Sequence, residues 1–103
     1  MSGYRAAGSL CAVVLSYVRP LDEVDALMPA HVAWLEAGFA EGAFLVAGRR
    51  DPRTGGVILM RGTADDVAAA AATDPFVTGG VATVEVIAFN ASFAQPDLAG
   101  LLA

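Results

Sequence analysis

The chain has 103 residues, which fits one domain, and we expect a single domain over 1–103 with a loose leader at 1–8 and a C-terminal tail at 91–103. Its net charge is −5 and its six cationic side chains are all arginines, which argues against nucleic acid or an anionic membrane surface as main partner. One cysteine excludes an internal disulfide framework and is typical of a cytoplasmic protein, and with one histidine it makes a structural metal site unexpected.

The run from Leu10 to Val18 is the first predicted element, a strand rich in valine and leucine. Together with Arg5 it superficially resembles a signal peptide, but nine apolar residues are too few to span a membrane. The run is followed by Arg19-Pro20 rather than by a small-residue cleavage site. We therefore expect a strand of a cytoplasmic protein.

A helical stretch opens at Asp22-Glu23, where acidic residues suit the positive end of the helix dipole. Pro29 restarts it, because proline is favoured in the first turn of a helix, and the main helix is predicted to run to about Glu41. The chain's one histidine, His31, therefore falls in an opening turn. The helical spacing predicts a buried stripe made of Leu27, His31, Trp34, Leu35 and Gly38.

Turn and cap signals predict the remaining elements. Two strands, Ala43 to Gly48 and Gly56 to Arg61, flank a segment whose proline, aspartate and glycines indicate a hairpin loop. A second helix is predicted over Ala64 to Thr73, and Asp74-Pro75 ends it because a residue before proline is pushed out of the helical conformation. The last strand is Val81 to Phe89, and a short helical turn follows near Pro96.

The order β-α-β-β-α-β predicts an α+β, ferredoxin-like protomer: an antiparallel sheet with both helices on one face. The first strand is apolar on both faces, with Cys11 and Val13 on one side and Ala12 and Val14 on the other, and we expect Cys11 to be a small core residue. Mean hydropathy, at +0.59, is high for so small a chain. Because helices cover only one face, we expect a second copy's sheet to cover the other, in a homodimer or higher homo-oligomer.

An imidazole on the inward face of a helix has two interpretations. His31 can be a core residue whose ring nitrogens are satisfied by backbone or water, which spacing alone slightly favours. It can instead carry chemistry, because the helix dipole disfavours a charged imidazolium and leaves a neutral ring able to accept a proton. The residues alone leave both interpretations open.

Asp74 is the candidate partner of His31, since it ends the second helix, which in this fold runs beside the first. A carboxylate that accepts a hydrogen bond from one ring nitrogen leaves the other nitrogen able to take or give a proton. Aspartate before proline is also an ordinary helix-stop signal, and on sequence alone that interpretation leads.

Three of the six arginines, Arg49, Arg50 and Arg53, lie within five residues just before Gly55-Gly56. An exposed cationic turn is the simpler interpretation. The functional one is a clamp for an anionic substrate, because arginine binds carboxylates through two parallel hydrogen bonds. Tyr17, at the carboxyl end of the first strand, is placed to donate its phenol to a pocket near the histidine.

These residues together resemble the YciI-like (YCII-related) family of small α+β-barrel proteins. The resemblance extends from about Leu10 to Phe89. No motif is specific alone, but their order and spacing match in four stretches: Tyr17-Val18-Arg19-Pro20-Leu21, Pro29-Ala30-His31-Val32-Ala33-Trp34-Leu35, Pro52-Arg53-Thr54-Gly55-Gly56-Val57-Ile58-Leu59 and Asp74-Pro75-Phe76.

The resemblance implies a dimeric α+β barrel with an active-site dyad formed by His31 and Asp74. It also implies small-molecule chemistry: an enzymatic relative is a dehydrochlorinase acting on a chlorinated hydroxyhydroquinone, and the wider superfamily includes muconolactone isomerases and monooxygenases. One departure matters. Family members often have Ser-Gly-Pro after the second strand, where this chain has Ala47-Gly48-Arg49, which removes a hydroxyl and adds an arginine.

Three functions are compatible with these residues and with the resemblance. The leading one is a cofactor-independent enzyme for a small cyclic or aromatic oxygenated substrate, acting by isomerisation or elimination. His31 and Asp74 would be catalytic, and Tyr17, Arg49 and Arg53 would bind substrate. The alternative is a non-catalytic dimeric module that binds a ligand or a protein. A haem- or flavin-assisted oxygenase is third, and it would need an exposed axial ligand or a large apolar cavity.

Overall fold

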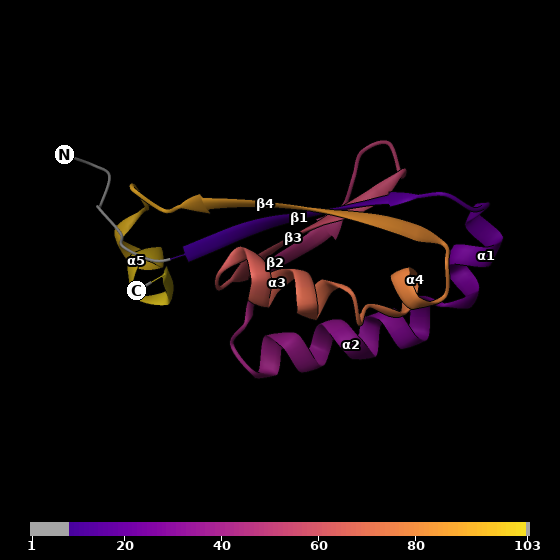
Figure 1. The fold of residues 1–103 in the computed structure, drawn as a ribbon, viewed down its shortest axis with the longest axis horizontal. Helices are drawn as coiled ribbons and strands as arrows, with labels where there is room; N and C mark the ends of the chain where they lie inside the picture. The colour runs from indigo at the N-terminus through magenta and orange to yellow at the C-terminus, as the bar shows by residue number, and fades with distance from the viewer. Residues whose placement is uncertain (1–8, 103) are drawn as a thin grey trace.

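The computed structural model describes residues 9–102, so the predicted leader at 1–8 lies outside the described residues. Its strands form one antiparallel sheet in the order β2-β3-β1-β4, with helices under one face (Figure 1). This is the ferredoxin-like arrangement that the sequence predicts. The elements are β1 (Ser9–Tyr17), α1 (Leu21–Ala26), α2 (Met28–Ala40), β2 (Phe44–Arg49), β3 (Gly55–Arg61), α3 (Ala64–Ala71), α4 (Pro75–Thr78), β4 (Ala82–Asn90) and α5 (Pro96–Leu102).

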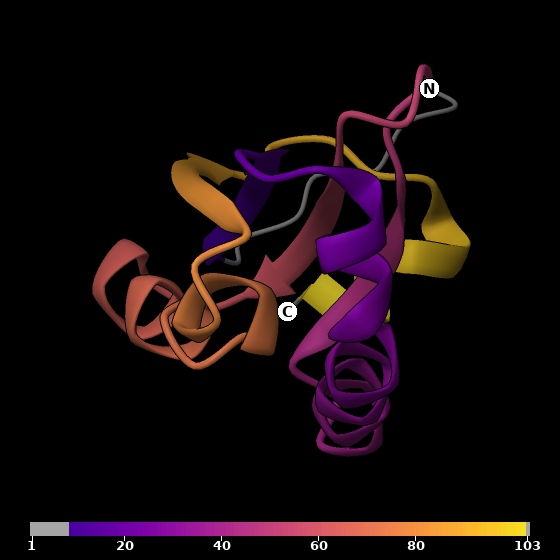
Figure 2. The same ribbon diagram turned by 90° about the vertical axis from the view of Figure 1, so that its right-hand side faces the viewer.

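The helix layer consists of α2 on one side and α3 with α4 on the other, as the end-on view in Figure 2 shows. The two sides meet where α4 contacts α2. Since α2 and α4 come from the two halves of the chain, this contact brings residues near position 30 against residues near position 75. That is where the candidate dyad lies.

The prediction that Asp74-Pro75 only ends a helix is incomplete. The second helix stops at Ala71, and Asp74 then caps a new short helix, α4, whose first residue is Pro75. The carboxylate of Asp74 accepts a hydrogen bond from the backbone N–H of Phe76. Proline supports this start, because its missing N–H has no helical partner at the first position. The segment therefore both stops α3 and starts α4.

The core lies between the sheet and the helices. Strand register aligns Cys11 with Met60 and Val13 with Ile58, and all four side chains are buried. This confirms the core position predicted for Cys11. Burial raises the pKa of the Cys11 thiol.

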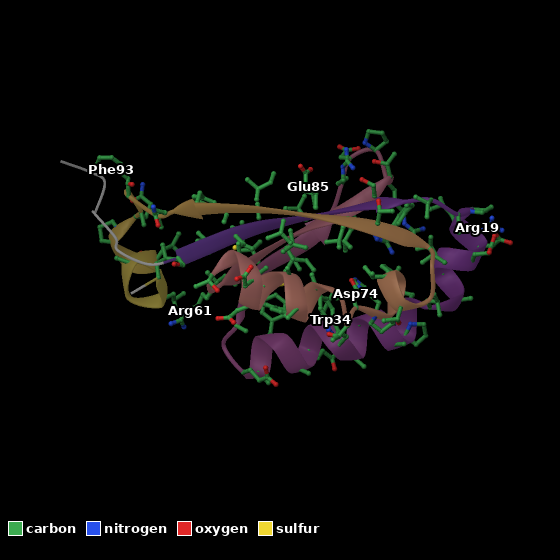
Figure 3. The ribbon with its side chains drawn as sticks, viewed as in Figure 1. Arg19, Trp34, Arg61, Asp74, Glu85 and Phe93 are labelled. Carbon is green, nitrogen blue, oxygen red and sulfur yellow. The ribbon has the colours of Figure 1, made fainter. Side chains whose placement is uncertain are left out.

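Among residues 9–102, no helix lies over the centre of the opposite face of the sheet, which remains partly apolar (Figure 1). Val14 is half-buried there, while Val57 and Ile87 are 38% and 47% exposed. Glu85, which pairs with Val14 across the strands, points to the same helix-free side (Figure 3). No helix within residues 9–102 is both long enough and apolar enough to cross a membrane.

Candidate active site

His31 lies in the first turn of α2, as its position two residues after Pro29 in the sequence predicts. Its backbone N–H donates to the carbonyl of Leu27 across 3.0 Å, and its side chain faces inward with only 8% of the residue exposed. The restart of the helix at Met28 therefore fixes the direction of the imidazole toward the sheet and α4.

Asp74 lies directly against this imidazole. Its Oδ1 is 2.8 Å from Nδ1 of His31 and also accepts the Phe76 backbone N–H across 2.9 Å. Asp74 is 1% exposed, and its other oxygen, Oδ2, has no hydrogen-bond partner among residues 9–102. A carboxylate at this distance favours the ring tautomer that carries its proton on Nδ1. The other nitrogen, Nε2, then keeps its lone pair.

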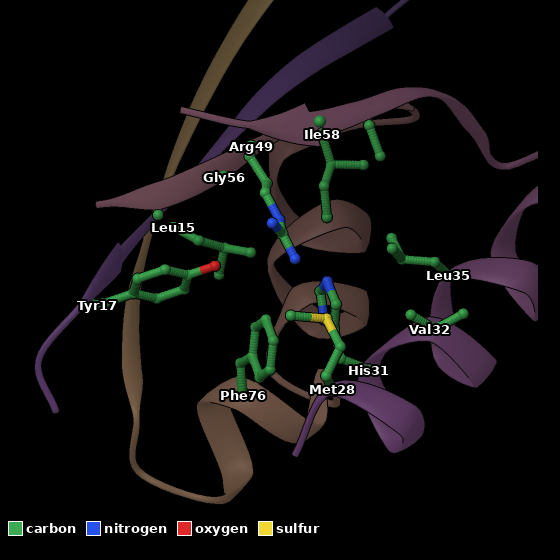
Figure 4. Close-up of a pocket in the computed structure, with 13 residues that line it drawn as sticks. Leu15, Tyr17, Met28, His31, Val32, Leu35, Arg49, Gly56, Ile58 and Phe76 are labelled. Atoms are coloured by element: carbon green, nitrogen blue, oxygen red, sulfur yellow. The ribbon is translucent and has the colours of Figure 1, made fainter. Parts of the chain in front are cut away.

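A cavity of about 250 Å³ adjoins the free side of the His31 ring. Three of its lining residues have side chains that can make polar contacts with a ligand: Tyr17, His31 and Arg49. Figure 4 shows the Arg49 side chain extending from β2 toward the imidazole, and the Tyr17 hydroxyl also points into the cavity. The remaining walls are apolar side chains or glycine: Leu15, Met28, Val32, Leu35, Ala47, Gly48, Gly55, Gly56, Ile58 and Phe76.

The three clustered arginines are placed differently. Arg49 lines the cavity, whereas Arg53 forms an ion pair with Asp25 of α1 and lies 5.9 Å from the centre of the Tyr17 ring. Arg50 donates to the Ser16 hydroxyl across 3.2 Å. The hydrogen bond with Arg53 lowers the pKa of the Asp25 carboxyl below its usual value. Arg53 therefore contacts the ring of Tyr17, which lines the cavity, but does not line the cavity itself.

Phe76 belongs to the site although the sequence argument assigned it no role. Its ring stacks on His31 with 3.8 Å between centroids and 9° between planes. The sequence shows only that an aromatic residue follows Asp74-Pro75, and the stacking itself depends on the contact between α2 and α4. Trp34 is placed outside the cavity lining, where its indole N–H donates to the Thr73 hydroxyl across 2.9 Å.

The chemistry open to this site is proton transfer. A base with a buried, oriented carboxylate faces a small cavity, which is the usual geometry of general acid–base catalysis. Within residues 9–102 there is no group of three or more histidine, cysteine, aspartate or glutamate side chains placed to hold a metal ion.

Comparison with known proteins gives a family match and a structural match. The family model of the YCII-related domain matches residues 11–90. Among solved structures, the chain is similar to 5-chloro-2-hydroxyhydroquinone dehydrochlorinase (TftG) from Burkholderia phenoliruptrix AC1100, in complex with 2,5-dihydroxybenzoquinone. The TM-score is 0.62 at 25% identity, and the alignment covers 78% of this chain and 90% of that chain. Comparison with curated proteins finds no match.

Proposed function

The chain belongs to the YCII-related family, and we propose that it is a cofactor-independent enzyme in which His31 moves a proton on a small cyclic or aromatic oxygenated substrate. The observation that carries this proposal is the 2.8 Å contact between His31 Nδ1 and Asp74 Oδ1 beside a cavity. A core histidine needs a partner but no cavity, so the cavity favours chemistry over a purely structural role.

In the proposed step, Nε2 of His31 removes a proton from a carbon or hydroxyl of the bound substrate. The buried Asp74 carboxylate stabilises the imidazolium that forms and keeps the ring in place. In an isomerisation the proton returns at another position. In an elimination a leaving group departs from the neighbouring position as an anion with its bonding electron pair, and the proton passes to solvent. Assistance of this kind contributes roughly 10²–10⁴-fold in rate.

The structural neighbour supports a choice of substrates to test. That protein is a 5-chloro-2-hydroxyhydroquinone dehydrochlorinase, and its structure contains 2,5-dihydroxybenzoquinone. A single ring with small substituents suits the cavity of about 250 Å³ in this chain, since cavities for drug-sized ligands run to about 300–1,000 Å³. We assign substrate contacts to Tyr17 and Arg49, and Arg53 contributes through Tyr17.

The proposal includes a second copy of the chain. The helix-free face of the sheet exposes Val57 and Ile87, and packing against the same face of another copy would remove this apolar surface from water. A dimer of this kind is also part of the alternative function, a non-catalytic module that keeps the cavity to bind a ligand. The two functions differ in whether His31 is needed for turnover.

The experiment is a turnover assay with 5-chloro-2-hydroxyhydroquinone, related hydroxyquinols and small unsaturated lactones. We expect His31→Asn to lose turnover and to unfold at a temperature close to that of the parent. Glu36→Gln is the matched control, because Glu36 lies in the same helix, is exposed and lies outside the cavity lining. Full turnover by His31→Asn would refute the proton-transfer role, and ligand binding without turnover by the parent would favour the module.

A further inference from the structure

We propose that the cavity selects a small monocyclic acid, and that Arg49 is the residue that selects it by binding the carboxylate. The proposal rests on the proposed function for the location of the site, but it concerns binding and not turnover. It assigns the anion-binding role that the sequence suggests for the arginine cluster to one residue and one class of ligand.

The first argument is that Arg49 lacks a partner. Arg19 and Arg53 each pair with a carboxylate, and Arg50 donates to a hydroxyl. Within residues 9–102, Arg49 makes no side-chain hydrogen bond or ion pair, although it lines the cavity. A guanidinium has five N–H donors in a planar fork that fits a carboxylate. The carboxylate of an incoming acid would accept hydrogen bonds from this fork.

The second argument is the charge of the cavity. Among the described residues its lining contains no aspartate or glutamate, so Arg49 is the one charged side chain that they contribute when His31 is neutral. The charge of Arg49 contributes to the lowered pKa of Asp25, but Asp25 forms its ion pair with Arg53. Asp74 is buried behind the imidazole and pairs with it. A protein of net charge −5 therefore presents a locally positive cavity, which favours an anionic ligand.

The third argument is the position of Arg49 relative to the base. The Arg49 side chain and the His31 ring point toward one another across the cavity (Figure 4). A ring whose carboxylate binds Arg49 therefore has its nearest carbons next to Nε2 of His31. The apolar walls on both sides, including Phe76, Leu35 and Ile58, suit the faces of that ring.

The test measures binding with a matched pair of probes, benzoate and its neutral isostere benzamide. By titration calorimetry and thermal unfolding we expect the parent protein to bind benzoate more tightly than benzamide. Hydrogen bonds to charged groups contribute about 1.5–3 kcal/mol, so Arg49→Gln is expected to weaken benzoate binding roughly 10–100-fold and leave benzamide unchanged. Arg49→Lys keeps the charge without the planar fork and should fall between. Arg50→Gln, next in sequence and outside the cavity lining, is the control.

The proposal is overturned if benzoate and benzamide bind the parent alike, if neither binds, or if Arg49→Gln binds benzoate as well as the parent does. It is also overturned if Arg49→Gln changes the oligomeric state but not benzoate binding, since Arg49 would then pair with another copy of the chain. Its failure is distinguishable from failure of the proposed function. The enzyme proposal is decided by turnover alone, which the binding titrations do not measure.

Discussion

The ring of Phe76 lies parallel to the imidazole of His31, with centroids 3.8 Å apart, while the backbone N–H of Phe76 donates to the same Asp74 oxygen that contacts the imidazole. One short segment thus supplies the carboxylate, the hydrogen bond that fixes the carboxylate, and the wall that fixes the ring. Because all three come from adjacent residues, the geometry of the dyad depends on a single local structure, the start of α4.

Replacing Asp74 separates its two roles. Asp74→Asn can still cap α4, so we expect stability close to that of the parent, but turnover reduced roughly 10²–10⁴-fold because the carboxylate that stabilises the imidazolium is gone. Asp74→Ala also loses the cap and leaves buried polar groups unpaired, at a cost of about 1–3 kcal/mol. Steady-state kinetics and urea unfolding measure the two effects. Thr73→Val, which removes the hydroxyl that accepts from the Trp34 indole and donates to the Ala70 carbonyl, is the control and should stay within a few-fold of the parent's turnover.

The cavity wall near Tyr17 depends on a glycine. A Cβ added at Gly55 would lie 1.8 Å from the backbone oxygen of Leu15, so β1 and β3 must separate. We expect Gly55→Ala to destabilise the fold by about 1–3 kcal/mol or more. At Gly48, on the neighbouring strand, a Cβ meets nothing within 4 Å. Gly48→Ala should therefore have little effect in the same urea titration, and equal losses for the two variants would contradict this account of the strand contact.

The Asp25–Arg53 pair predicts a dependence of stability on pH. Arg53 lowers the folded-state pKa of Asp25, so the pair stabilises the fold above the unfolded-state pKa of about 3.9 and the gain is lost as pH falls through the lower folded-state value. Asp25→Asn should be less stable than the parent at neutral pH, and the difference should shrink below about pH 4. Asp22→Asn, in the same helix, is the control. A difference for Asp25→Asn that persists at the acid end would rule out the pair as its cause.

The helix-free sheet face predicts association. Ile87 is 47% exposed in the middle of β4, and a glutamate there would be buried without a partner if two sheets pack together. We expect Ile87→Glu to sediment as a monomer in analytical ultracentrifugation while the parent sediments as a dimer. Ala69→Glu, on the exposed side of α3, tests whether added charge alone has this effect. A monomeric parent, or a dimeric Ile87→Glu, would contradict the face-to-face arrangement.

Much of this fold could be predicted because its signals are local. Pro29 marks the start of the helix that carries His31, and the valine-rich run from Leu10 to Val18 marks the first strand. The separate destinations of Arg49 and Arg53 could not be predicted. Arg49 ends β2 and Arg53 lies four residues later in the loop that follows. Arg53 pairs with Asp25, and the position of Asp25 in the tertiary structure is not indicated by the local sequence.

The same limit explains why Asp74 was ambiguous. A carboxylate before proline is an ordinary helix-stop signal in the sequence, and in the structure the same Asp74 oxygen both caps α4 and contacts the imidazole of His31. The stacking of Phe76 on His31 is not predictable from the sequence for a related reason. It requires the contact between α2 and α4, which no spacing within either element indicates.

The most direct test of the central claim is the tautomer of His31, read from a nitrogen–proton NMR correlation on protein labelled with ¹⁵N-histidine. The chain contains one histidine, so the spectrum reports this ring alone. At a pH where the ring is neutral, we predict that Nδ1 carries the proton and Nε2 is bare, and that Asp74→Asn weakens this preference. A proton on Nε2 in the parent protein would contradict the account, because the nitrogen facing the cavity could not then accept one from a substrate.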